Sequence, residues 1–320
     1  MLFTMRQLEY FVTTCETGSI TEAALTIPVA QSSVSAAIAQ LEKALGVQLL
    51  IRHHAQGVSP TPEGRRFAER ARALLQEAGD LERFASELTD ELSGVLDLGC
   101  LVTLAPLITP RLARDFKERN PGVHVRLSAS GQQEIFDRLR EGGLSLAMTY
   151  DLDLERDIAF EPLAALPPYA VFPADHPLAR ADSVGLRELA KLPLVLLDLP
   201  HSREYFYALF QVAGLRPTVA QRSRNPEVIR TLVANGFGYT IVNARPVTEV
   251  ALDGTPLRSV RIDGEPRAML LGLAVLASAT STRLTEAFAQ YCRDLIAAEE
   301  FPGLPAGATQ SIDFSAATQR

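Results

Sequence analysis

The sequence contains few cysteines. Only three of its 320 residues are cysteine, namely Cys15, Cys100 and Cys292. They lie far apart in the chain, their odd number gives no disulfide framework, and their spacing is not that of metal ligands. We therefore expect three buried thiols and no metal site, while redox sensing by Cys100 is left open.

A long apolar run is also missing. The longest, AMLLGLAVLA from Ala268 to Ala277, has about half the length that a membrane-spanning helix needs. The first residues, MLFTMRQLEYF, include Arg6 and Glu9 and do not resemble a secretory signal. We therefore expect a cytoplasmic protein.

The chain has no excess of positive charge. Its formal net charge is −7, and residues 1–66 contain five basic and five acidic side chains. Nonspecific affinity for nucleic acid comes from cations that neutralise phosphates, so charge gives such a function little support. A content of 47% apolar and 22% charged residues is typical of a folded protein, and the length allows two or three domains.

The beginning of the chain has the pattern of three helices. Apolar residues recur at helical spacing over residues 5–15. A second, short helix over residues 19–27 can be capped by a serine or threonine and is stopped by Pro28. A third covers residues 31–45 and ends at Gly46. Two helices joined by a short turn predict a helix-turn-helix.

A hairpin and a long helix follow. Two short extended segments around Gln56 and Gly57 predict a β-hairpin wing. From Thr61, a candidate cap, and Pro62 a helical apolar pattern continues to about Leu92. An unbroken helix of about thirty residues is typical of a helix that pairs with another.

Beyond Gly94 strands and helices alternate, which predicts a parallel α/β sheet. The predicted strands cover residues 95–100, 124–130, 144–148, 170–172, 194–197, 219–223, 239–242 and 269–277. The predicted helices cover residues 107–120, 132–141, 184–190, 202–213, 226–235 and 282–299. Residues 301–320 are rich in small residues without a period, so we expect a flexible tail there.

The sequence shows no catalytic motif. Gly236 and Gly238 form a G-x-G without the third glycine and the acidic partner of a dinucleotide site. A phosphate-binding Walker lysine motif, a G-x-S-x-G turn and a zinc-protease helix are all missing. The adjacent His53 and His54 have no third ligand nearby, which favours a solvated loop over a metal site. We expect no enzyme and no cofactor.

These features together resemble one family. Residues Arg6 to Arg52, RQLEYFVTTCETGSITEAALTIPVAQSSVSAAIAQLEKALGVQLLIR, are similar to the winged helix-turn-helix of LysR-type transcriptional regulators. The following TPEGRRF is similar to the start of that family's linker helix, and VANGFGYTIV at Val233 to Val242 to a glycine motif of its sensor half. The resemblance covers nearly the whole chain.

The resemblance implies an α/β protein with an N-terminal winged helix-turn-helix, a long linker helix and a two-lobed effector domain like that of periplasmic binding proteins. The implied DNA-binding domain is residues 1–62, and the linker and dimerisation helix is 63–92. The effector domain would be 93–300, with lobe one at 93–163 and 267–300 and lobe two at 164–266, before the tail at 301–320.

The third helix is the expected DNA-reading element. Several of its residues lie off the apolar face, although in isolation this would only be a solvated helix face. The set is Gln31, Ser32, Ser33, Ser35, Ala36, Ala39 and Gln40. Where the family usually has a serine cap and often a basic residue, this chain has Ala30 and Ala36. The expected phosphate contacts are therefore Arg52, His53, His54, Arg65 and Arg66.

For the effector, the resemblance places Thr103 after the first strand of the effector domain, near helix amides that could hold a carboxylate. The loop of Ser130, Gly131 and Gln132 would face the same cleft between the lobes. The further candidates from lobe two are His201, Ser202, Tyr205, Asn225 and Phe237. Ser202 and Asn225 stand where helices begin, so helix capping is an equal alternative for both, and Phe237 could simply pack.

The expected function is therefore a sequence-specific transcriptional regulator whose binding to double-stranded promoter DNA changes with a small-molecule effector, a carboxylate or aromatic acid. The expected partners are a second copy or three further copies of the chain, in a homodimer or homotetramer, and RNA polymerase. Two other classes are a solute-binding module with an assembly helix, which the missing export signal disfavours, and a metabolic enzyme with a regulatory head.

Overall fold

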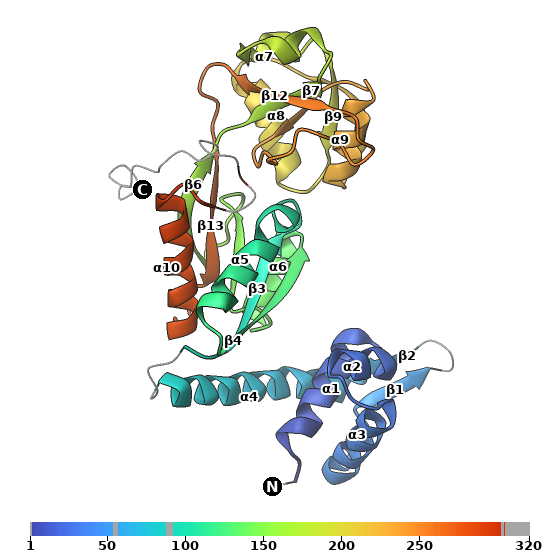
Figure 1. Ribbon diagram of the computed structural model, residues 1–320. Coiled ribbons are helices and arrows are strands. Elements are labelled where there is room, and N and C mark those ends of the chain that lie inside the picture. Colours follow the sequence, from blue (N-terminus) through green and yellow to red (C-terminus); the bar gives the residue numbers. More distant parts are fainter. Residues whose placement is uncertain (1, 54–56, 88–91, 302–303, 305–320) are drawn as a thin grey trace. The chain divides into compact units, whose positions relative to one another are not determined.

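The computed structural model describes residues 2–53, 57–87, 92–301 and 304 (Figure 1). The chain divides into two compact units. The first, called the head below, is Met1–Gly94 with Glu141–Gly143. The second, called the effector half, is Val95–Arg140 with Leu144–Arg320.

The head begins with three helices, as the sequence predicts: α1 (Met5–Thr17), α2 (Ile20–Thr26) and α3 (Gln31–Leu45). Thr4 and Gln7 form a capping box at the start of α1, and Ser19 caps α2 by accepting from the backbone N–H of Glu22. Ala30 stands at the cap of α3 and supplies no side-chain hydrogen bond.

The wing and the linker helix are held to the head by backbone contacts. Strands β1 (Leu50–His53) and β2 (Gly57–Pro60) pair antiparallel, and α4 (Pro62–Glu87) follows. Thr61 caps α4 as predicted, because its hydroxyl accepts from the N–H of Gly64 at 2.8 Å. A Cβ at Gly64 would collide with the carbonyl of Leu49, so the glycine of TPEGRRF permits this close approach.

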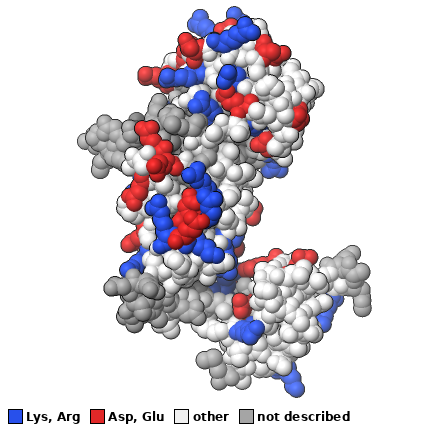
Figure 2. Space-filling view, in the orientation of Figure 1, with Lys and Arg blue, Asp and Glu red and all other residues white. Residues whose placement is uncertain are grey.

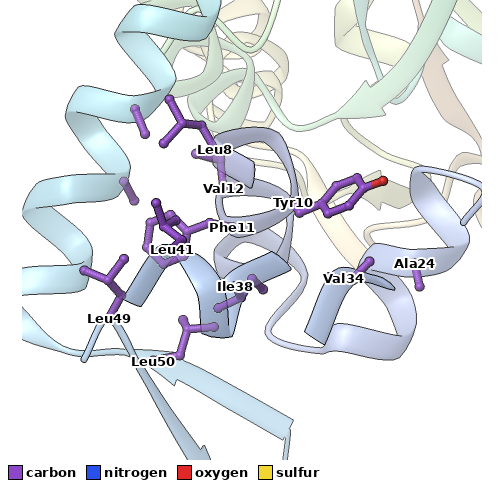
Figure 3. Packing of buried hydrophobic residues seen from close by; sticks show 12 residues of the cluster. Leu8, Tyr10, Phe11, Val12, Ala24, Val34, Ile38, Leu41, Leu49 and Leu50 are labelled. Atoms are coloured by element: carbon purple, nitrogen blue, oxygen red, sulfur yellow. The ribbon is translucent and has the colours of Figure 1, made fainter. Parts of the chain in front are cut away.

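One apolar core joins the three helices to the start of α4. It contains Leu8, Phe11, Ile38 and Leu41 around the wing residues Leu49 and Leu50 (Figure 3). Ala68 and Ala71 of α4 belong to the same cluster, and Phe67 packs on Phe11 at 5.7 Å between ring centroids. The first turns of the linker helix therefore complete the head.

Lobe one of the effector half is a five-stranded sheet with three helices. Its strand order is β4-β3-β5-β13-β6. The strands are β3 (Gly94–Leu101), β4 (Val123–Ser130), β5 (Leu146–Tyr150), β6 (Ile158–Leu166) and β13 (Met269–Leu276). The helices are α5 (Ala105–Arg119), α6 (Gln132–Arg140) and α10 (Arg283–Ala297). Phe116 of α5 meets Phe288 of α10 edge to face at 5.1 Å, and α6 packs on β5 and β13.

Lobe two contains a four-stranded sheet, β11-β7-β12-β8, and a two-stranded sheet, β10-β9. The strands are β7 (Tyr169–Pro173), β8 (Ser183–Val184), β9 (Pro193–Leu197), β10 (Thr218–Ser223), β11 (Thr240–Val242) and β12 (Leu257–Ile262). The helices are η1 (Pro177–Arg180), α7 (Leu186–Leu189), α8 (Ser202–Val212) and α9 (Pro226–Ala234). The chain passes between the lobes after β6 and again before β13 (Figure 1).

Several expectations need correction. The five-stranded and four-stranded sheets are mixed rather than parallel, because β13 pairs antiparallel with β5 and β6, and β7 pairs antiparallel with β11 and β12. The sheet of β9 and β10 is parallel as predicted. Strands β6, β8 and β12 were not predicted, and the helix expected over residues 184–190 is the single turn of α7. Leu92 is not helical, while residues 88–91 lie outside the described residues.

The described part of the expected tail is small. Phe301 and Leu304 are both buried, and the rest of residues 301–320 lies outside the described residues. Across the described residues, no single helix has the length and apolar character needed to cross a membrane; the bent pair of α2 and α3 meets these criteria only jointly.

Candidate DNA-binding surface and effector site

The outer face of α3 carries small polar side chains. Val34, Ile38 and Leu41 are buried in the core of the head. The opposite face exposes Gln31, Ser32, Ser33, Ala36, Ala39 and Gln40, and Ser35 is half-buried beside them. The structure thus brings the predicted DNA-reading residues together on one accessible helix face that contains hydrogen-bonding groups and, one turn after Gln40, the exposed Lys43.

The amide of Gln40 has a fixed orientation. The backbone N–H of Thr4 donates to Oε1 of Gln7 at 2.8 Å, so the amide nitrogen of Gln7 faces α3. That nitrogen donates to Oε1 of Gln40 at 3.3 Å. Gln40 therefore presents its N–H groups outward, and it is suited to acceptors such as phosphate or the O6 and N7 atoms of guanine.

The predicted phosphate contacts lie on β1 and at the start of α4. Arg52, His53, Arg65 and Arg66 are exposed. His53 shares a hydrogen bond of 2.8 Å with Ser59, and Arg65 donates to the carbonyl of Pro60 at 3.1 Å. In the described part of the chain no carboxylate forms an ion pair with Arg52 or Arg66. His54 lies outside the described residues.

Charge is sparse over the head. Figure 2 shows a largely uncharged head surface with separate basic and acidic side chains, whereas acidic and basic side chains intermingle over the effector half. The wing carrying Arg52 is tied to α3 by Glu42, whose carboxylate accepts from the N–H groups of Leu49 at 2.8 Å and Leu50 at 3.0 Å. Sequence reasoning did not find this role of Glu42.

In lobe one, Thr103 lies where two parallel strands end. β3 and β5 run parallel, so the segment after β3 and Tyr150 at the end of β5 share one sheet edge. Oγ1 of Thr103 is buried next to the hydroxyl of Tyr150, and the two side chains interact with each other. Burial raises the pKa of Tyr150 well above its ordinary value, so this hydroxyl keeps its proton. Such strand ends are the usual ligand positions in α/β proteins.

The loop after β4 lies beside Thr103. The backbone N–H of Val102 donates to the carbonyl of Ser130 at 2.9 Å. Gly131 is exposed, and a Cβ added there would meet open space. The hydroxyl of Ser130 donates to Glu134 at 2.9 Å, and the buried amide of Gln132 donates to the carbonyl of Leu152. Gln132 therefore holds the loop after β5.

His201 of lobe two reaches lobe one. Its Nδ1 lies 2.5 Å from Oδ2 of Asp153, in the loop after β5. His201 and Asp153 both adopt positive φ angles, 63° and 41°, which side-chain-bearing residues rarely do. His201 occupies the cap position of α8, so Ser202 is the first helical residue and does not cap.

Tyr205 belongs to a buried polar network between lobe two and the two crossing strands. Its hydroxyl donates to the carbonyl of Arg267 at 2.6 Å. Nδ2 of Asn243 donates to the hydroxyl of Tyr205 and to the carbonyl of Leu166, both at 2.9 Å. Tyr205 and Thr103 both influence the pKa of Tyr150, Tyr205 through its charge and Thr103 through a side-chain hydrogen bond.

The last two candidates lie at opposite ends of α9. Asn225 caps this helix, because its side-chain oxygen accepts from the N–H groups of Glu227 and Val228. Phe237 follows the other end of the helix and is 49% exposed. Helix α9 therefore separates Asn225 from Phe237, and both stay predictions for the effector site.

Sequence reasoning missed Tyr150, Asp153 and Asn243. Tyr150 could have been found, because it comes two residues after the strand predicted over residues 144–148, which runs parallel to the one before Thr103. Asn243 follows β11 in the same way. Asp153 had no signal, because its partner His201 comes 48 residues later in the chain.

The cysteines are buried to different degrees. Cys100 and Cys292 are buried as predicted, and burial raises the pKa of both thiols; Cys15 is only half-buried, with a pKa raised by burial to about 11. Among the described residues there is no group of three histidine, cysteine or carboxylate side chains that could hold a metal ion.

A winged helix-turn-helix head followed by a two-lobed α/β half defines the class of one-chain, ligand-responsive transcriptional regulators. Residues 5–65 match the family described as "Bacterial regulatory helix-turn-helix protein, lysR family". Residues 89–297 match "LysR substrate binding domain". The chain therefore belongs to the LysR family of transcriptional regulators, which bind DNA and are not enzymes.

Similar proteins include the HTH-type transcriptional regulator EstR of Acinetobacter baylyi, 38% identical over 242 residues that cover 74% of this chain and 79% of EstR. The uncharacterized regulator YybE of Bacillus subtilis is 28% identical over 286 residues, 89% of this chain and 96% of YybE. The crystal structure of HinK, a LysR family regulator from Pseudomonas aeruginosa, matches with 38% identity and a TM-score of 0.62 over 92% of this chain and 99% of HinK.

Proposed function

We propose that this regulator binds a small carboxylate or aromatic acid between its two lobes, and that the ligand changes how the head engages promoter DNA. The main support is the buried hydroxyl of Thr103, which lies beside the hydroxyl of Tyr150 at the ends of two parallel strands, next to the open space at Gly131. Two hydroxyls that share one hydrogen bond keep one hydrogen to donate, and leaving it unpaired when buried costs free energy. A ligand oxygen would accept it.

The proposed DNA contacts are the outer face of α3 and the cations of the wing and linker entry. Gln31, Ser32, Ser33, Ser35 and Gln40 would meet base edges or phosphates, and Arg52, His53, His54, Arg65 and Arg66 would meet phosphates. The proposed domains are the DNA-binding domain at residues 1–62, the linker helix at 63–92, the effector domain at 93–300 and the tail at 301–320. The linker helix would join copies into a dimer or tetramer that works with RNA polymerase in the cytoplasm, where the promoter is.

The test is footprinting and mobility shift with the full chain on DNA upstream of its own gene, over a range of salt concentrations. We expect a specific, salt-sensitive site of approximate twofold symmetry. Gln31→Ala, Ser33→Ala and Arg52→Ala should weaken binding to it, while Arg187→Ala in the effector half should not. Failure to detect a specific site at any salt concentration would refute the proposal.

The effector part is tested separately by Thr103→Val, which keeps the side-chain shape and removes the hydroxyl. Carboxylates that raise the melting temperature of the unmodified protein should lose this effect in the variant, and DNA binding without ligand should remain. Equal shifts in both proteins would place the ligand elsewhere.

A further inference from the structure

The side-chain amide of Asn243 is buried at the junction of lobe two with the crossing strands. Only 4% of the residue is exposed. Its Nδ2 has two hydrogens, and both are used, one toward the carbonyl of Leu166 and one toward the hydroxyl of Tyr205. Oδ1 is buried as well and has no partner among the described residues.

The orientation of this amide is fixed by its neighbours. The carbonyl of Leu166 can only accept, so it must face Nδ2 rather than Oδ1. The hydroxyl of Tyr205 gives its hydrogen to the carbonyl of Arg267 and therefore accepts from Asn243. Rotating the amide would set two oxygens against each other at Leu166. Oδ1 is thus left as an acceptor that only a donor from outside this network can satisfy.

The hydrogen bonds already formed around Asn243 and Thr103 limit which donors and acceptors remain for a ligand. Tyr205 has no hydrogen left to donate. The hydroxyl of Tyr150 interacts with the side chains of Thr103 and Tyr205 and keeps its proton, because burial raises its pKa. The hydroxyls of Thr103 and Tyr150 have two hydrogens, and a hydrogen bond between them uses one. The region therefore has one donor at the Thr103 end and an unsatisfied acceptor at the Asn243 end.

A charged donor fits poorly at Asn243. Burying a cation next to a neutral amide is costly without a carboxylate partner. Asp151 is already paired with Arg267 at 2.8 Å and Asp153 with His201 at 2.5 Å. A neutral hydroxyl satisfies Oδ1 without this cost.

We propose that the effector is a hydroxylated carboxylate, whose carboxylate lies toward Thr103 and whose hydroxyl donates to Oδ1 of Asn243. This inference rests on the proposed effector site and adds the donor group to it. It makes Asn243 a specificity-determining residue, because an acid without the hydroxyl leaves the buried oxygen unpaired.

The test compares acids that differ only at the hydroxyl, by calorimetry and thermal shift with the unmodified full chain. Three series are suitable: lactate, propionate and O-methyl lactate; malate, succinate and O-methyl malate; and meta-hydroxybenzoate, benzoate and meta-methoxybenzoate. In a series that binds, we expect the hydroxy acid to bind about tenfold more tightly than both other members, as one buried hydrogen bond implies. The methyl ethers keep the oxygen and lose the donor, so they separate donation from size.

Two variants test whether Asn243 causes the preference for the hydroxy acid. Asn243→Ala should remove the preference for the hydroxy acid, whereas Tyr205→Phe removes a hydroxyl of the same network, leaves Oδ1 in place and should keep the preference. Circular dichroism melting and DNA binding show whether each variant is folded. If Asn243→Ala does not fold, the methyl ethers still decide the matter in the unmodified protein.

The binding results distinguish a wrong hydroxyl donor from a wrong carboxylate effector. Equal binding within every series that binds would overturn the donor inference and leave the carboxylate effector standing. Binding by none of the nine acids would refute the carboxylate effector, and the inference would fall with it. A hydroxyl preference that survives Asn243→Ala in folded protein would assign the donor to another acceptor and overturn the role of Asn243.

Discussion

The head has few cations, so each one matters to the proposed contact with DNA. The outer face of α3 exposes Ala36 and has Lys43 as its one cation, two turns further along, and the charges of residues 1–66 cancel. Arg52 on the wing is exposed and forms no ion pair with the described carboxylates, so its charge is available to a phosphate. Each phosphate contact releases a counterion and steepens the salt dependence of binding.

We therefore expect Arg52→Ala to lower the slope of log affinity against log salt by about one. Affinity should fall for specific and nonspecific DNA alike, because the contact carries no sequence information. Titrations by fluorescence anisotropy at several salt concentrations measure both quantities. Arg187→Ala, an exposed arginine of α7, is the matched control. An unchanged slope for Arg52→Ala would remove this residue from the interface.

Among the helices of the head, α3 begins without a side-chain cap. Ala30 has the extended backbone of a cap residue, with φ −67° and ψ 136°, but no side-chain oxygen to accept from the first turn. A serine in this place typically stabilises a helix by about 1 kcal/mol. The head thus keeps a recognition helix whose first turn, with Gln31, Ser32 and Ser33, is weakly held.

We expect Ala30→Ser to slow hydrogen exchange in the first turn of α3 roughly fivefold, which corresponds to about 1 kcal/mol. Mass spectrometry of the full chain measures this exchange by segment. Ala36→Ser adds the same hydroxyl on the exposed face of α3, away from the cap, and should not slow exchange. Equal rates in Ala30→Ser and the parent protein would show that the first turn is already fully held.

The helices were predictable because capping and apolar spacing act locally; α1, α2 and α3 follow from the sequence almost to the residue. The strands were less predictable than the helices. Strand β6 contains Glu161 and Pro162, which break the apolar pattern, and the register against β13 shifts nearby, between Leu271 and Gly272. Pairing direction is set by distant segments, so alternation alone wrongly predicted parallel sheets.

At the scale of the whole effector half, site residues depend on where the lobes meet. Thr103 could be placed from the strand that precedes it, and it lies at a sheet edge as such positions do. The bond between Tyr205 and Asn243 joins residues 38 positions apart, and no local rule predicts it. The sequence therefore predicted the position of Thr103 at a sheet edge, and missed the hydrogen bonds between lobe two and the crossing strands.

The pair of His201 and Asp153 links the lobes directly, and lobe motion is what an effector would control. The loop that carries Asp153 is itself held to lobe one, because Gln132 binds Leu152 and Arg140 pairs with Glu155 and Asp157. Movement of His201 is thus resisted by the body of lobe one. The pair is partly exposed, at 29% for His201 and 70% for Asp153, so its contribution should be modest, below about 1 kcal/mol.

We expect His201→Ala and Asp153→Ala each to broaden the distribution of distances between nitroxide labels at Glu118 of lobe one and Val212 of lobe two. The double variant should broaden it no further than either single variant, because both remove the same link. His201→Asn should restore much of the narrow distribution, since its amide can donate to Asp153 and asparagine tolerates positive φ. Additive broadening in the double variant would mean that the two residues act on the lobes independently, and the link between them would then not hold the lobes together.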